Sequence, residues 1–121
     1  MRDTDPDEFI DKAVKTGSRN GIEALDADQR FVYLVSEAEV YCDMQGINGF
    51  LDRYSPQWIE ETAAAFAELG ASEIATTFRT IAANAMWDDQ LLEHITTLIV
   101  SRSGYDYDTV RRAIKTRIMD H

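Results

Sequence analysis

Two side chains, Cys42 and His94, could in principle form a nucleophile and its general base. The helical spacing of the surrounding sequence argues against that chemistry. Cys42 falls on the same predicted helix face as Phe31, Val35 and Ala38, where a thiol behaves as a small apolar side chain. We therefore expect Cys42 to lie in the core, and we expect the protein not to be an enzyme.

A second group, Asp89, Glu93 and His94, has the residue types that bind metals. A helical di-metal site places a histidine three residues after a glutamate, whereas Glu93 and His94 are adjacent. The chain also lacks a Gly-x-Ser-x-Gly motif and a dinucleotide fingerprint. The sequence therefore predicts neither a metal nor an organic cofactor, and the acidic side chains are expected on a solvated helix face.

Residues typical of helix starts and stops, together with apolar residues at helical spacing, occur along the whole chain and predict an all-α fold. Asp5-Pro6 and Asp26 are typical helix starts, and Gly17 and Gly70 are typical stops. No stretch alternates with the period of a β-strand. We expect residues 1–121 to form one domain, a single compact bundle of five or six helices.

The helix expected near residues 27–44 is apolar on two sides, which is typical of a central helix. Tyr33, Val40 and Met44 lie opposite its main apolar face. Gly46 and Gly49 interrupt the pattern, so residues 45–54 are expected to form a loop or a short irregular helix. The predicted core comprises Leu34, Val35, Phe66, Phe78, Leu91, Ile95 and Leu98, with Trp58 and Trp87 as further anchors.

The charge distribution limits the classes of partner. Twenty-two acidic residues against twelve basic ones give a net charge of −10, and residues 31–100 hold eleven acids but only Arg53 and Arg79. Such a chain is not expected to bind nucleic acid or an anionic membrane directly. A single cysteine and an N-terminus without an apolar segment favour a cytoplasmic location.

The segment from Glu37 to Tyr54, which contains Gly46-Ile47-Asn48-Gly49-Phe50, and the later Ala67-Glu68-Leu69-Gly70-Ala71 carry a family resemblance. They resemble the small acidic all-helical proteins grouped around a bacterial DNA-mimic protein, most of which have no assigned function. Gly49-Phe50 and Gly70-Ala71 match the family pattern. Ile47-Asn48 and Asp52-Arg53 depart from it. The resemblance covers residues 31–83.

This resemblance implies an acidic protein-interaction domain that occupies the basic surface of a DNA-binding protein. Each carboxylate would stand in for a backbone phosphate, the group from which DNA-binding proteins gain much of their affinity. Glu61 and Glu68 would lie about 10 Å apart along one helix face. The candidate partner-binding residues are Glu60, Glu61, Glu68, Asp89 and Glu93.

Two other interpretations of the protein's interactions remain alternatives to DNA mimicry. The protein could be a helical interaction or adaptor module whose partner does not bind DNA, with its acidic residues serving only solubility. It could also pair with a second copy of itself. An enzyme is the least favoured class.

Overall fold

The computed structural model describes residues 5–83 and 88–119, and in these residues it contains helices but no strand. This confirms the all-α prediction, with seven α-helices instead of five or six. The additional helix is the short α3, in the segment expected as a loop or a short irregular helix. The helices are α1 (Pro6–Asn20), α2 (Ala27–Met44), α3 (Asn48–Arg53), α4 (Pro56–Glu68), α5 (Ser72–Ala83), α6 (Asp89–Val100) and α7 (Tyr107–Met119), with a 3-10 turn at Ile22–Ala24.

Aspartate caps explain where several helices begin. Asp26 and Gln29 form a reciprocal capping box at the start of α2, with both hydrogen bonds at 2.9 Å. Asp5 and Asp88 accept hydrogen bonds from backbone N–H groups of the first turns of α1 and α6. Asp106 does the same before α7. These carboxylates stabilise the helix starts, and the predicted starts at Asp5 and Asp26 are confirmed.

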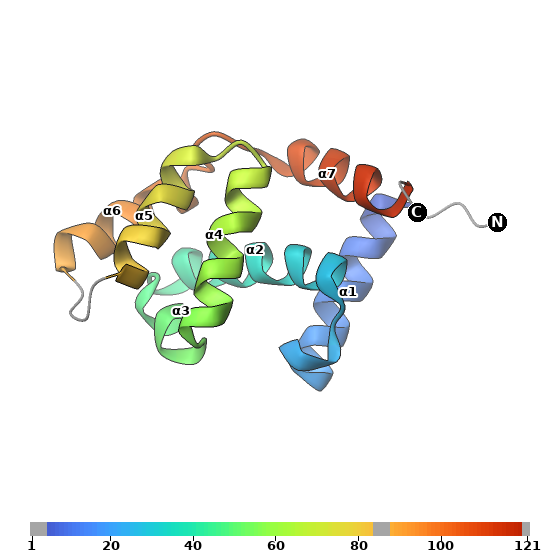
Figure 1. Ribbon diagram of the computed structural model, residues 1–121, viewed down its shortest axis with the longest axis horizontal. Helices are drawn as coiled ribbons and strands as arrows, with labels where there is room; N and C mark the ends of the chain where they lie inside the picture. The colour runs from blue at the N-terminus through green and yellow to red at the C-terminus, as the bar shows by residue number, and fades with distance from the viewer. Residues whose placement is uncertain (1–4, 84–87, 120–121) are drawn as a thin grey trace.

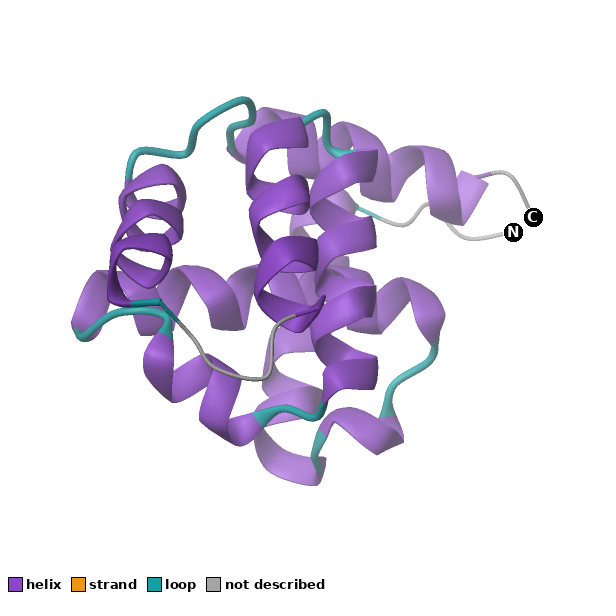
Figure 2. Cartoon of the chain, turned by 60° about the vertical axis from the view of Figure 1, so that its left-hand side comes forward, coloured by secondary structure: helices purple, strands orange, loops and turns teal. Residues whose placement is uncertain are grey.

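Helix α2 is the hub of the fold, as predicted, because α1, α3, α4, α6 and α7 all pack against it (Figures 1 and 2). Its first half, Phe31–Val35, is buried on every side. The second half is not, since Val40 and Met44 are 45% and 78% exposed. The prediction of a two-sided apolar helix is therefore wrong beyond Val35, where no element of the described residues covers Val40 and Met44.

The predicted core is confirmed at five of its seven positions, where Leu34, Val35, Phe66, Phe78 and Ile95 are all at most 2% exposed. The two remaining positions, Leu91 and Leu98, are only partly buried. The sequence spacing also predicts Leu92 and Ile99 on the inner face of α6, and both are buried there with Ile95. Of the two tryptophans, Trp58 is partly buried, and Trp87 lies outside the described residues.

Gly17 does not end α1, which corrects the sequence prediction. The helix continues to Asn20, and Gly21, with a φ of +91°, ends it by donating its N–H to the Gly17 carbonyl. Gly17 is instead a buried position inside the helix, beside the ring of Tyr33.

The segment that carries the family resemblance turns sharply and then packs inward. Both glycines are typical of a tight bend with positive φ, and this is confirmed at Gly46, whose φ is +114°, but not at Gly49. Gly49 has a different role, because a Cβ atom there would lie 2.9 Å from the ring of Tyr41. Phe50 and Tyr54 are buried, with ring centres 4.9 Å apart. The motif therefore builds the core beneath α3.

Candidate interaction surface

Helix α4 carries three of the five predicted partner-binding carboxylates, and each of them pairs with an arginine of another helix. Glu60 accepts from Arg79 of α5 at 3.2 Å, Glu61 from Arg30 of α2 at 2.7 Å, and Glu68 from Arg117 of α7 at 2.6 and 2.9 Å. The α4 carboxylates therefore stabilise contacts between helices, in addition to any role toward a partner.

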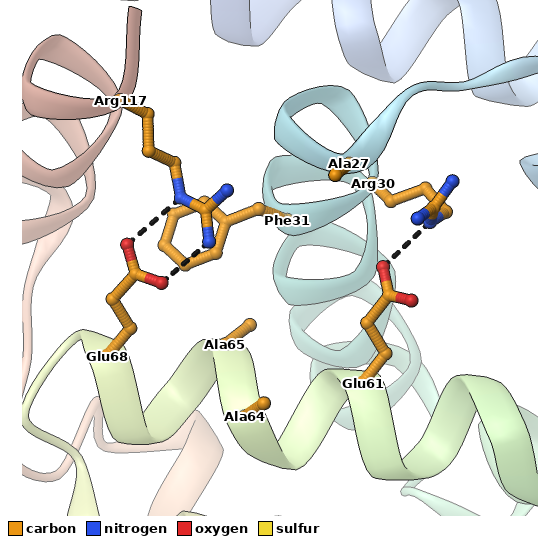
Figure 3. Close-up of a pocket in the computed structure, with 8 residues that line it drawn as sticks. All are labelled: Ala27, Arg30, Phe31, Glu61, Ala64, Ala65, Glu68 and Arg117. Carbon is orange, nitrogen blue, oxygen red and sulfur yellow. Dashed lines mark hydrogen bonds and ion pairs between the residues drawn. The ribbon is translucent and has the colours of Figure 1, made fainter. Parts of the chain in front are cut away.

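A shallow groove of about 220 Å³ runs between α2 and α4, and two of these ion pairs flank it (Figure 3). Ala27, Ala64 and Ala65 line it, and their small side chains leave it open. The Arg30 guanidinium also lies 5.3 Å from the centre of the Trp58 ring, a cation–π contact that holds the arginine in place.

The other two predicted residues, Asp89 and Glu93, are exposed on α6 and form no ion pair within residues 5–83 and 88–119. They line an open groove of about 370 Å³ where α3 begins beside α6. Its remaining lining residues are Gln45, Gly46, Asn48, Leu92 and Thr96. The Ile47 N–H donates to Thr96 Oγ1 at 3.2 Å and fixes the start of α3 against α6.

The five predicted residues do not share one face. Helix α5 packs against both α4 and α6, and Glu60 points toward it. Glu61 and Glu68 point instead toward α2 and α7. The structure thus separates the ion-paired α4 glutamates from Asp89 and Glu93, which have no ion pair in the described part of the chain.

Periodicity alone does not reveal a partly buried polar cluster that links α2 to the segment between α6 and α7. Glu39 accepts a 2.6 Å hydrogen bond from Tyr105 and pairs with Arg102 at 3.2 Å. Arg102 also bonds Asp43 at 3.1 Å and adopts a left-handed φ of +54°. Burial raises the pKa of Glu39 and of Tyr105. Glu39 therefore anchors the turn that leads into α7.

Glu37, two residues before Glu39 on α2, has a similar structural role. It accepts from Tyr54 at 2.9 Å and from Arg53 at 3.2 Å. The signal for these roles in the sequence is that Glu37 and Glu39 interrupt the largely apolar stretch 31–42 of α2. Some of the eleven acidic residues in 31–100 therefore stabilise the fold.

The structure separates the groups considered for nucleophilic catalysis. Cys42 is 6% exposed, which confirms its predicted place in the core. Burial raises the pKa of its thiol to about 12. His94 instead lies 3.2 Å from Glu73 of α5. Within the described part of the chain, no three His, Cys, Asp or Glu side chains are placed to hold a metal ion.

Cys42 is expected to react very slowly with thiol reagents while the protein is folded. A thiol with a pKa near 12 has a thiolate fraction at neutral pH roughly a thousandfold smaller than one at the ordinary value of 9.0. Labelling with a chromogenic disulfide reagent, in buffer and in concentrated urea, measures the difference. Equal rates in the two solvents would contradict the buried position.

Helices packed around one core, with a surface rich in carboxylates and marked by shallow grooves, define a small acidic all-helical domain. Residues 23–115 match the family model described as DMP19-like protein. The chain therefore belongs to the DMP19-like protein family, and the segment that carried the resemblance, residues 31–83, lies inside the match. Neither the curated proteins nor the solved structures contain a significant match. No helix in the described residues has both the length and the apolar character needed to cross a membrane.

Proposed function

We propose that this protein is an acidic interaction domain that acts as a DNA mimic, occupying the basic surface of a DNA-binding protein. The observation that carries the proposal is the pair Asp89 and Glu93, exposed carboxylates that have no counter-ion among residues 5–83 and 88–119 and that lie beside an open groove. Unneutralised carboxylates can replace phosphates as partners for arginine and lysine side chains. The net charge of −10 and membership of the DMP19-like family support the same function.

The α4 residues are the second part of the proposed surface. Glu60 and Glu61 each accept their arginine through one carboxylate oxygen, Oε2, so a partner's basic group could approach the other oxygen. Both oxygens of Glu68 already bond Arg117. We therefore rank Asp89 and Glu93 above the α4 group as contacts for a partner.

A double variant, Asp89→Asn with Glu93→Gln, is expected to weaken binding of the basic partner by roughly 2- to 30-fold. This range assumes that each contact contributes as much as one exposed ion pair. The fold should remain intact because neither side chain has an ion pair to lose within the described residues. Partners captured from a lysate at low salt supply the ligand, and titration at several salt concentrations measures the affinity.

A matched control is the double variant Glu8→Gln with Glu23→Gln. This control removes the same charge, and its two side chains are also exposed. They lie on α1 and the 3-10 turn, away from α6. Duplex DNA should displace the wild-type protein from its partner. Equal losses in both double variants, or simultaneous binding of DNA and this protein, would contradict DNA mimicry.

The alternative is an adaptor whose partner does not bind DNA. Two observations favour it: the α4 glutamates are neutralised internally, and α2 exposes Val40 and Met44 one turn apart. An apolar contact would be insensitive to salt, whereas a phosphate-like surface would release its partner as salt rises. The salt titration therefore distinguishes the two functions.

A further inference from the structure

Arg117, in the last turn of α7, makes the most extensive contacts of any arginine at the α4 surface (Figure 3). Its Nη2 and Nε donate to the two carboxylate oxygens of Glu68 at 2.6 and 2.9 Å. Its Nη1 donates to Asp28 of α2 at 2.7 Å, and its guanidinium lies 4.3 Å from the centre of the Phe31 ring. One side chain thus serves as counter-ion to carboxylates of two helices.

These are the contacts that a basic partner would make with the same carboxylate. A bidentate guanidinium is the preferred geometry for recognising a planar carboxylate or phosphate group. We propose that Arg117 is an autoinhibitory contact that covers Glu68, so that an arginine-rich partner must displace it before using the α4 surface. This inference rests on the proposed function, because it assumes that the surface binds a basic partner.

The surroundings of Arg117 allow such a displacement without unfolding α7. The helix is anchored by the buried Val110 and Ile114 and by Arg111, which pairs with Asp7 of α1 at 2.8 Å. The Arg117 side chain is 25% exposed and that of Glu68 is 42% exposed, so solvent and competing cations reach the pair. The pair is therefore only partly buried, and a partner's guanidinium can compete for the same carboxylate oxygens.

The contact also lies at the margin of the family match, which ends at residue 115. The matched region therefore contains Glu68 but not the arginine that covers it.

The test measures binding of a short oligoarginine peptide at low salt. Arg117→Met removes the guanidinium but keeps an apolar side chain against Phe31. It should raise the affinity by about 2- to 5-fold, the gain expected when a partly exposed ion pair no longer competes. Arg117→Lys keeps the charge but loses the bidentate geometry, and it should give a smaller gain. Circular dichroism checks the fold of each variant, and Arg117→Lys serves as the test if Arg117→Met does not fold.

Arg112→Met is the matched control for the change in net charge. Arg112 is exposed on the same helix and pairs with no carboxylate among the described residues. Equal gains from Arg117→Met and Arg112→Met would overturn the proposal, as would a gain that persists when Glu68→Gln is added to Arg117→Met. The Asp89→Asn and Glu93→Gln experiment is independent of this result. The proposal of DNA mimicry can therefore fail while the proposed role of Arg117 holds. The opposite result is equally distinguishable.

Discussion

Replacing Ile95 with alanine is expected to lower the free energy of unfolding by about 2–5 kcal/mol. Ile95 is fully buried in the middle of α6, which packs against α2 and α5. The shorter side chain loses its burial and leaves a cavity that helices held on both sides can close only in part. Urea denaturation of the wild type and the variant, followed by circular dichroism, measures the difference.

Leu91→Ala on the same helix is the matched control. Leu91 is only partly buried, so its truncation should cost clearly less than that of Ile95. A loss below about 1 kcal/mol at Ile95 falls within the range of surface sites. That result, or equal losses at the two positions, would show that the inner face of α6 is not the one containing Ile95.

The register of α6 shows how far the sequence can predict this fold. Capping residues and apolar spacing locate the helix and its buried centre, Ile95. On either side, however, two apolar residues are adjacent, Leu91-Leu92 and Leu98-Ile99, and neighbours on a helix differ by about 100° in direction. Only the positions of α2 and α5 decide that Leu92 and Ile99 face inward.

The candidate site is predictable only in part, for a related reason. Periodicity places Glu61 and Glu68 on the outward side of α4, but it does not reveal which basic side chains lie opposite. Arg30 is 31 residues from Glu61 in sequence, and Arg117 is 49 residues from Glu68. These ion pairs arise from the packing of α2 and α7 beside α4. A count of acidic residues therefore overestimates the charge available to a partner.

Gly17→Ala is expected to lower the free energy of unfolding by about 1–3 kcal/mol, because the added methyl group overpacks the core. At an exposed position within a helix, the same change would be stabilising by roughly 1 kcal/mol. The sign reverses here because a Cβ atom on Gly17 would lie 2.5 Å from two ring atoms of Tyr33. Tyr33 is 1% exposed in the centre of α2, so its ring has little space into which to move.

A double-mutant cycle with Tyr33→Leu tests this explanation through thermal or urea denaturation. Removing the aromatic ring frees the space beside α1, so the penalty of Gly17→Ala should shrink or change sign in the Tyr33→Leu background. Ser18→Ala, at the exposed neighbouring position, should alter stability by less than about 0.5 kcal/mol. If the Gly17→Ala penalty stays the same without the ring, its origin is the backbone of α1 and not the packing of α1 on α2. The close approach of these two helices would then not require a glycine.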